Sequence, residues 1–215
     1  MLGELVVAGD EASFLIDAVL VGPAAPFGSH GGRSGIVKTP ATGPVPVETG
    51  GMAGDEQADR RYHGGPEKAV HHYAFDHYAE WKRSLRPACR AVLATPGAFG
   101  ENLSTSGLTE AEVCVGDIWR AGTALLQVSQ ARQPCFKLNH RFGLADMAIR
   151  VQSSGRAGWY YRVVEPGAIA AGDALRLVER PHPNWPLSRL LHAFDRPPRG
   201  GPRVELVHGG PLRHG

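Results

Sequence analysis

The chain has 215 residues, which is enough for one catalytic domain with a sizeable core and a short appendage. Its 23 basic and 21 acidic residues leave a formal net charge of +2, which gives no electrostatic indication of a nucleic-acid or membrane partner. The 28 glycines and 17 prolines favour many turns and short strands over long helices. We therefore expect small-molecule chemistry on a mostly β fold of the α+β class.

Short runs with strand character recur along the chain, and Gly or Pro bounds most of them. In chain order, strands are predicted over residues 14–22, 34–38, 44–48, 112–120, 123–130, 160–165 and 174–179. Gly116-Asp117 and Gly172-Asp173 each form a turn signal that leads into an apolar run. This recurrence suggests turns of one closed sheet.

One helix is clearly indicated between these strands. From Val70 to Leu85 the apolar residues recur at intervals of three and four, which predicts an amphipathic helix that begins at Pro66. Pro66 suits the first helical position, Glu67 suits the first turn, and Pro87 marks the far end. We expect this helix to pack on the sheet.

The character of the chain changes beyond residue 180. We predict a β domain over residues 12–180, followed by a linker and a helical remnant over residues 181–195. Within that remnant, residues 187–194 are long enough for about two helical turns. Residues 196–215 contain five glycines and four prolines with almost no apolar periodicity, so a flexible tail is predicted there.

The three cysteines, Cys89, Cys114 and Cys135, are odd in number and show no CxxC spacing. Neither a disulfide framework nor a structural zinc site is therefore indicated, and a reducing compartment is expected. Residues 1–20 contain four acidic residues and no basic segment ahead of an apolar stretch, so they do not resemble a signal peptide. No segment approaches the roughly 20 apolar residues that cross a bilayer. These features predict a cytoplasmic protein.

A polar loop before the predicted helix is a candidate anion site. It passes through residues 54–59 and reaches the helix start at His63, Gly64, Gly65 and Lys68. Free N–H groups at a helix start attract anions, glycines allow close backbone approach, and Lys68 adds a positive charge. Phosphate binding is one interpretation; the other is that the glycines only turn the chain and His63 caps the helix.

Glu101 and Asn102 form a second polar segment, which adjoins the glycines of residues 97–103. They either line a pocket or only make a turn, because Asn and Gly favour left-handed conformations and Glu is ordinarily solvated.

Cys135 lies in a third segment, residues 129–138, with Arg132 and Lys137 close in sequence. These cations would favour the thiolate, which is the form that attacks electrophiles or binds a soft metal. The alternative is a small buried hydrophobic residue. Cys89, after a helix end, and Cys114, in an apolar strand, are interpreted as structural.

Other common sites find no support in the sequence. A dinucleotide-binding GxGxxG in a βαβ unit, a Walker loop and a GxSxG elbow are all missing. His71, His72 and His77 do not predict a zinc site, since neighbouring histidines on a helix would project on different faces and no HExxH occurs.

The ordered set of these motifs resembles the MOSC family, named for the C-terminal domain of molybdenum cofactor sulfurases, and most closely its stand-alone bacterial members of the YiiM type. The matching segments are Gly54-Asp55-Glu56-Gln57-Ala58-Asp59, residues 63–71, Gly100-Glu101-Asn102-Leu103, Gly116-Asp117, residues 132–138, Gly158-Trp159-Tyr160, Gly172-Asp173, Glu179-Arg180-Pro181 and Trp185. Each segment alone is modest evidence, whereas the ordered set is specific.

The resemblance implies a β-barrel with flanking helices and a cleft for the molybdenum cofactor, the molybdenum–molybdopterin group. The cysteine at position 135 then becomes the metal ligand and catalytic centre. The segment from His63 to Lys68, with Gly64 and Gly65, and Arg132 become partners of the pterin and phosphate. Glu101 and Asn102 would lie near the metal.

The resemblance also implies an activity, namely reduction of N-hydroxylated small molecules such as hydroxylaminopurines. The sequence has no flavin, nicotinamide or iron–sulfur fingerprint, so a separate reductase would supply electrons. Two alternatives are a sulfur carrier with a persulfide on Cys135 and a non-catalytic module that binds or transfers the cofactor. The oligomeric state is left open, with a homodimer as one option.

The chain departs from the family pattern at its C-terminus. YiiM-type proteins usually end in a three-helix domain, of which only the first helix is recognisable here, at residues 187–194. We expect a curtailed ending, either natural or caused by an altered reading frame, and any function of that domain is in doubt for this chain.

Overall fold

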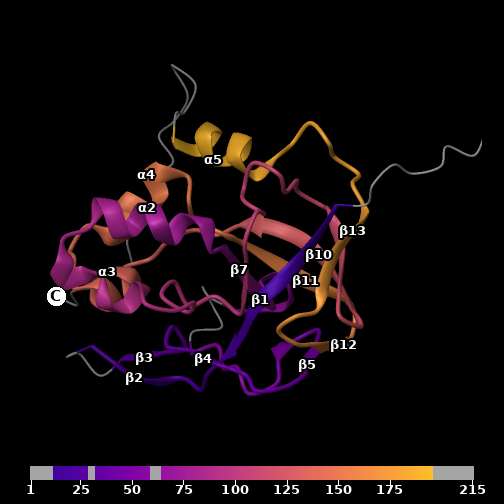
Figure 1. The fold of residues 1–215 in the computed structure, drawn as a ribbon, viewed down its shortest axis with the longest axis horizontal. Helices are drawn as coiled ribbons and strands as arrows, with labels where there is room; N and C mark the ends of the chain where they lie inside the picture. Colours follow the sequence, from indigo (N-terminus) through magenta and orange to yellow (C-terminus); the bar gives the residue numbers. More distant parts are fainter. Residues whose placement is uncertain (1–11, 29–31, 59–63, 196–215) are drawn as a thin grey trace, which may run out of the picture.

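The computed structural model describes residues 12–28, 32–58 and 64–195, and a closed β-barrel forms its centre (Figure 1). The main sheet has the strand order β13-β9-β10-β11-β7-β8-β1-β4, and antiparallel pairing of β13 with β1 closes seven of these strands into a barrel. Its strands are β1 (Ser13–Val21), β4 (Thr39–Pro40), β7 (Val70–Ala74), β8 (Leu103–Thr105), β9 (Ile118–Ala121), β10 (Ala124–Ala131), β11 (Trp159–Glu165) and β13 (Ala174–Glu179). The predicted α+β barrel is confirmed.

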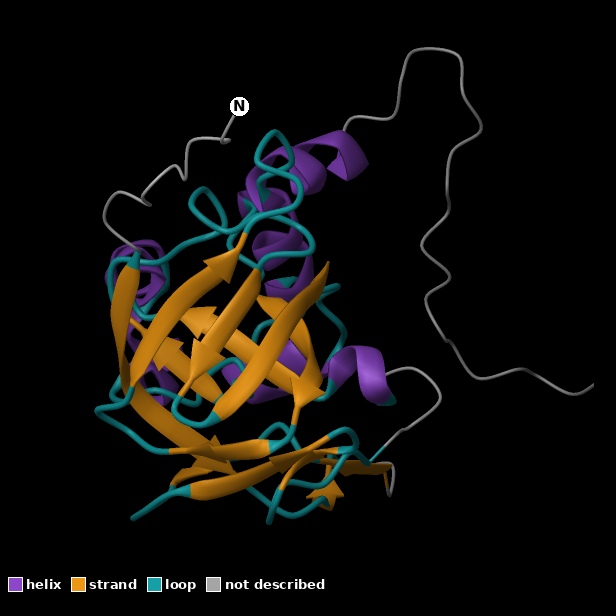
Figure 2. Ribbon diagram, turned by 90° about the vertical axis from the view of Figure 1, so that its right-hand side faces the viewer, coloured by secondary structure: helices purple, strands orange, loops and turns teal. Residues whose placement is uncertain are grey.

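Two small sheets lie at one end of the barrel, at the bottom of Figures 1 and 2. The first contains β12 (Gly167–Ile169), β5 (Val45–Glu48) and β6 (Gly51–Met52), and the second pairs β2 (Ala25–Phe27) with β3 (Gly32–Ser34). Burial alternates along β5, so that Val45 and Val47 enter the barrel core while their neighbours face solvent. This period of two is what makes the segment a strand with one buried face.

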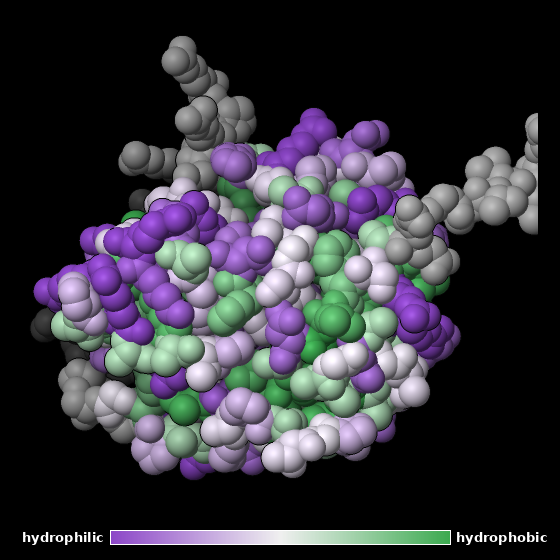
Figure 3. Space-filling view, in the orientation of Figure 1, coloured by the Kyte–Doolittle hydropathy of each residue, from purple (hydrophilic) through white to green (hydrophobic). Residues whose placement is uncertain are grey.

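Helices cover one side of the barrel and enclose a second core. They are α2 (Asp76–Ser84), α3 (Lys137–Phe142), α4 (Met147–Ser154) and α5 (Leu187–Asp195), with 3-10 turns η1 (Pro66–Lys68), η2 (Pro87–Cys89) and η3 (Ala91–Leu93). The first core fills the barrel around Trp119 and Trp159, and the second packs under the helices around Tyr73 and Phe99, whose rings stack at 4.0 Å. In Figure 3, hydrophilic side chains cover the helical side, whereas hydrophobic patches appear over the strands.

The prediction of one continuous helix from Pro66 to Leu85 was wrong. Residues 66–68 form only a 3-10 turn, residues 70–74 form strand β7, and the α-helix begins at Asp76. All five residues of β7 are buried, because β7 pairs with β11 on one side and runs parallel to β8 on the other. A strand buried on both faces lacks the alternation of buried and exposed residues, so the apolar positions of β7 blend into the pattern of the following helix.

Most predicted strands are confirmed, at residues 14–22, 44–48, 123–130, 160–165 and 174–179, and each observed end lies within one residue of the predicted end. Two were too long. Of residues 34–38 only Ser34 is in a strand, and of residues 112–120 only the last three are, because Gly116 has a φ of 80° and turns the chain with Asp117. Helices α3 and α4 were missed, since six and eight residues carry too little periodicity to be recognised.

The C-terminal helix predicted at residues 187–194 is confirmed as α5. The boundaries of the predicted domains remain predictions, and residues 196–215 lie outside the described part of the chain. Across the described ranges, the structure contains no helix with the length and apolar character needed to cross a membrane.

Gly158 is expected to be a sensitive position for stability. It has a φ of 76°, and an added Cβ would lie 2.3 Å from the His72 carbonyl oxygen, so Gly158→Ala combines backbone strain with a clash against β7. We expect the free energy of unfolding to fall by about 3 kcal/mol. Gly155 is a matched control: its φ is 68° with nothing within 4 Å of the added Cβ, so Gly155→Ala should cost about 1 kcal/mol. Equal losses in urea denaturation would contradict the clash.

Candidate functional site

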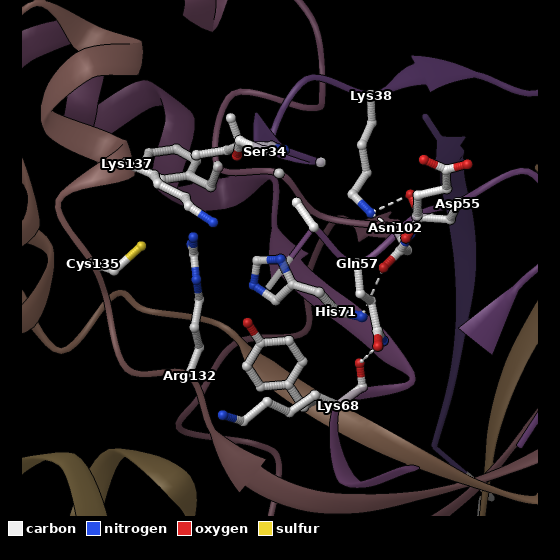
Figure 4. A pocket seen from close by; sticks show the side chains of 17 residues that line it. Ser34, Lys38, Asp55, Gln57, Lys68, His71, Asn102, Arg132, Cys135 and Lys137 are labelled. Carbon is white, nitrogen blue, oxygen red and sulfur yellow. Dashed lines mark hydrogen bonds and ion pairs between the residues drawn. The ribbon is translucent and has the colours of Figure 1, made fainter. Parts of the chain in front are cut away.

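A pocket opens where the connection between β10 and α3 faces the segments that follow β3 and β6 (Figure 4). Polar residues dominate its wall. The lining residues are Ser34, Gly35, Ile36, Lys38, Asp55, Glu56, Gln57, Ala58, Lys68, His71, Phe99, Gly100, Asn102, Arg132, Cys135, Lys137 and Tyr160.

Cys135 and two cations form one wall of this pocket. The backbone N–H of Arg132 donates to the Gly158 carbonyl at 2.9 Å, which holds the end of β10 against β11. The Cys135 carbonyl then accepts from the N–H of Leu138 at 3.0 Å, and α3 begins there. Figure 4 shows the Cys135 sulfur on the same side of the cavity as the head groups of Arg132 and Lys137. An anionic ligand at this wall would be attracted by both charges.

A buried ion pair forms the opposite wall. The Lys38 ammonium contacts the Asp55 carboxylate, and both side chains are only 7% exposed. Asp55 also accepts a hydrogen bond from the Gly22 N–H at 3.1 Å, which ties the pocket to the end of β1. Burial lowers the pKa of Lys38 while Asp55 opposes that shift. Lys38 is therefore paired within the protein, and its charge is balanced before any ligand binds.

Gln57 holds the loop that carries Gly65 and Lys68 in place. Its side-chain amide donates to the Lys68 carbonyl at 3.1 Å, and its carbonyl oxygen accepts from the Gly65 N–H at 3.1 Å. Gly65 has a φ of 93°, a conformation that favours glycine, and Pro66 begins the 3-10 turn directly afterwards. The loop is thus positioned by a side chain from the pocket wall and not by a helix start, which alters the basis of the predicted anion site.

Asn102 joins three chain segments beside the pocket. Its side-chain oxygen accepts from the His71 N–H at 3.0 Å, and its amide donates to the Leu20 carbonyl at 3.1 Å. Asn102 is buried, so these bonds hold β7 and β1 at fixed separation. Asn102 supports the floor of the pocket as well as lining it.

The predicted site residues are brought together only in part. Cys135, Arg132, Lys68 and Asn102 line the pocket, and Gly65 adjoins it through Gln57. Gly64 neighbours Gly65 without being part of the lining, and His63 lies outside the described residues.

Glu101 has a different position from the one expected near a metal. Its carboxylate is fully buried and accepts hydrogen bonds from the Gly97 and Phe99 N–H groups, at 2.7 and 3.0 Å, and from the Tyr78 hydroxyl. It does not line the pocket. Glu101 instead stabilises the loop of residues 97–100. Gly100, which directly precedes Glu101 in the chain, lines the pocket.

His71 is a pocket residue that sequence reasoning did not select. In strand β7, His71 and His72 point to opposite faces of the sheet. His71 lines the pocket. The two ring nitrogens of His72, Nδ1 and Nε2, instead form hydrogen bonds with the hydroxyls of Tyr161 and Thr105, at 3.1 and 2.9 Å. The matched segment of residues 63–71 contained the signal, but a helical assignment concealed it.

The buried His72 predicts acid sensitivity of the fold. Burial lowers the pKa of His72 from 6.5 to about 3 in the folded state. As the pH falls below 6.5, His72 becomes protonated in the unfolded chain but stays neutral in the folded chain. The free energy of unfolding therefore decreases by about 1.4 kcal/mol for each pH unit below that value. Urea denaturation between pH 6.5 and 4.5 should show a shallower decline for His72→Gln than for the wild type. Identical slopes would contradict this role.

Comparisons with known proteins agree with the motifs found in the sequence. Residues 59–176 match the MOSC domain family. Protein YiiM of Escherichia coli is 47% identical over 151 residues, covering 70% of this chain and 66% of the relative. The uncharacterized protein YflK of Bacillus subtilis is 46% identical over 149 residues, covering 69% of this chain and 65% of the relative. The chain thus spans slightly less than two thirds of the length of these two bacterial relatives.

Further relatives extend the comparison to function and fold. A protein of Gibberella moniliformis named Reductase is 45% identical over 161 residues, which cover 74% of this chain and 28% of the relative. The crystal structure of YiiM from Geobacillus stearothermophilus has a TM-score of 0.68 at 37% identity, covering 84% of this chain and 83% of that one. The crystal structure of YiiM from Escherichia coli has a TM-score of 0.68 at 35% identity, covering 85% of this chain and 77% of that one.

Proposed function

The chain belongs to the MOSC family and is of the YiiM type, and from this premise we propose that it is a molybdenum-cofactor-dependent reductase of N-hydroxylated compounds such as hydroxylaminopurines. The observation that carries the proposal is the placement of Cys135 in a polar pocket beside Arg132 and Lys137. A related protein named Reductase supports the reaction class.

The pocket residues fit such a group on two grounds. His71 Nε2 and Arg132 Nη1 are buried in the pocket wall and make no hydrogen bond to any described residue, so a ligand that pairs with them would remove the cost of leaving them unpaired. A cysteine sulfur is a soft ligand suited to a metal such as molybdenum. Cys135 would hold the metal, and Arg132, Lys68 and the backbone around Gly65 would hold the pterin and phosphate.

The cofactor, when bound, supplies two-electron chemistry that removes the oxygen of an N–OH group. The overall reaction consumes two electrons and two protons, converts R–NHOH to R–NH2 and releases water. The electrons would come from a separate reductase. The chain itself supplies binding and orientation: Arg132 and Lys137 attract the anionic cofactor, Gln57 positions the loop at Lys68, and the Lys38 ion pair keeps the opposite wall fixed.

The decisive experiment measures turnover. Protein purified from cells that make the cofactor, supplied with an artificial electron donor, should convert 6-hydroxylaminopurine to adenine, which chromatography separates. Protein that contains stoichiometric molybdenum but leaves this and other N-hydroxylated compounds unchanged would favour a binding or transfer module. A persulfide on Cys135 without molybdenum, detected by mass spectrometry, would favour a sulfur carrier.

A further inference from the structure

Basic residues concentrate in two segments on the helical side of the protein. Residues 80–90 and 146–156 together contain six basic residues and two acidic ones. The basic residues are Lys82, Arg83, Arg86, Arg90, Arg150 and Arg156. The rest of the chain holds the other 17 basic and 19 acidic residues, so it is negative on balance. The net charge of +2 is thus distributed unevenly, and such asymmetry attracts an oppositely charged partner to one side of a protein.

The two segments meet in space, where α2 lies beside α4 (Figure 1). The guanidinium of Arg156 lies over the Trp81 ring, 5.9 Å from its centroid. The pKa of Asp146 is lowered first by its hydrogen bond with Arg150 and also by the charge of Arg86, which comes from the other segment. In Figure 3, hydrophilic side chains cover this side of the molecule. The six basic residues therefore share one surface, which we call the basic face.

The acidic residues of the basic face do not cancel its charge. Glu80 forms an ion pair with Arg83, and Asp146 forms one with Arg150 at 2.9 Å. Both pairs are balanced internally, so the other four basic residues provide an excess of positive charge. Ile149 is 60% exposed in the same helix as Arg150 and offers an apolar contact. An apolar side chain within a charged rim is typical of a surface that binds another protein.

The basic face lies close to the pocket that contains Cys135. Phe99 lines this pocket, and the centroid of its ring is 6.0 Å from that of Trp81. Arg156 lies over the same Trp81 ring, so a path of two aromatic side chains leads from the pocket to the basic face. Helix α3, which begins directly after the pocket segment, also packs against α4. A protein bound to the basic face would therefore bring its own redox group near the pocket.

The chemistry of the proposed function indicates what binds there. Reduction of R–NHOH consumes two electrons, and the sequence has no flavin, nicotinamide or iron–sulfur fingerprint that would supply them. An electron donor must therefore approach the pocket from outside, and complementary charge steers such encounters. Interfaces between redox proteins are small and weak, so a few charged residues around an apolar contact are sufficient. A nucleic acid would also be attracted by positive charge, but it cannot supply electrons.

We propose that the basic face is the docking surface for an electron-carrier protein with an acidic surface. This inference deepens the proposed function and rests on it, because it names the place at which the separate electron donor binds. Two reduced carriers each lose one electron, and the pocket takes up these two electrons and two protons as R–NHOH becomes R–NH2 and water.

Binding of flavodoxin, a small acidic carrier of flavin mononucleotide, tests this surface independently of cofactor loading. Isothermal titration calorimetry of the full chain should detect binding at about 20 mM salt. The affinity should fall at least about tenfold at about 0.3 M salt, because salt screens the attraction between exposed charges. No detectable binding at low salt, or an affinity that does not respond to salt, would overturn the proposal.

A double charge reversal locates the surface. Lys82→Glu combined with Arg86→Glu should weaken flavodoxin binding at least about tenfold. The matched control is Arg120→Glu combined with Arg176→Glu, the same change of charge at two residues that lie opposite each other on β9 and β13. Figure 1 places β13 on the other side of the molecule from α2 and α3. The control should weaken binding about twofold or less, and equal losses would show that net charge governs binding instead of the basic face.

Thermal unfolding checks that both double variants fold. Lys82→Glu alone decides the question if the first double variant does not, since Lys82 is exposed on α2 and its reversal should weaken binding about threefold. Unchanged affinity in a folded Lys82→Glu variant would contradict the proposal. A short duplex DNA is the competing probe. Tighter binding of DNA than of flavodoxin, lost in the same variants, would identify a nucleic-acid site and overturn the proposal.

The source of electrons separates docking from catalysis. With reduced flavodoxin as the donor, kcat/KM for flavodoxin should fall at least about tenfold in the Lys82→Glu, Arg86→Glu variant during turnover of 6-hydroxylaminopurine. Turnover driven by dithionite should match the wild type, because a small donor needs no docking surface. Equal losses with both donors would contradict a docking role.

The proposed function and this inference can fail separately. Molybdenum loading and turnover with dithionite, in a protein that does not bind flavodoxin, would overturn only the docking surface. Salt-dependent flavodoxin binding that is lost in the double variant, in a protein that neither binds molybdenum nor reduces N-hydroxylated compounds, would overturn only the reductase.

Discussion

Cys135→Ser is expected to lose at least about 90% of its bound molybdenum, and turnover of N-hydroxylated compounds with it. A serine hydroxyl stays protonated at neutral pH and is a hard donor, so it replaces a cysteine sulfur poorly on a soft metal. Cys135 is half-buried at the pocket wall, so the substitution removes a sulfur from the site without opening a cavity in either core. Elemental analysis of molybdenum per chain gives the result directly.

Cys89 provides the matched control. Its sulfur accepts from the Arg86 Nε–H at 3.3 Å, under the helices and outside the pocket. Cys89→Ser should keep the molybdenum content of the wild type, although its buried position will cost some stability. Equal molybdenum in the Cys135 and Cys89 variants would show that Cys135 is not the ligand, and the proposed function would lose its main support.

Glu101→Gln should lower the free energy of unfolding by about 3 kcal/mol, because hydrogen bonds to a charged group contribute about 1.5–3 kcal/mol each. The carboxylate is fully buried and accepts from the Gly97 and Phe99 N–H groups and from the Tyr78 hydroxyl. A glutamine loses the charge and turns an N–H group towards at least one of these donors. Denaturation in urea at neutral pH measures the loss.

Tyr78→Phe calibrates that result, since it removes one of the three donors and keeps the charge. It also leaves the Ala98 N–H without the hydroxyl to which it donates at 3.0 Å, so a loss of about 1–2 kcal/mol is expected. A loss below about 1 kcal/mol for Glu101→Gln would mean that the loop does not depend on the carboxylate.

Local pattern was sufficient for the parts of the fold whose burial is one-sided. Strands β1, β5, β10, β11 and β13 were all predicted, and so was α5, because a repeated polar face is visible in the residues themselves. The pocket residues Cys135, Arg132, Lys68 and Asn102 lie in segments that combine charge, glycine and a thiol within a few positions, and the family resemblance of those segments selected them as site residues. These choices required no knowledge of long-range contacts.

The sequence by itself determined the mostly β class and the family motifs, because each depends on residues close together in the chain. The resemblance carried by those motifs implied the barrel and the role of Cys135. Only the tertiary structure decided that residues 70–74 form a strand, since this follows from pairing with β11 and β8. That pairing turns His71 into the pocket and His72 away from it. The tertiary structure also decided that Glu101 stabilises a loop. The hydroxyl of Tyr78, one of the donors to its buried carboxylate, is brought there by packing between distant parts of the chain, which no local sequence pattern predicts.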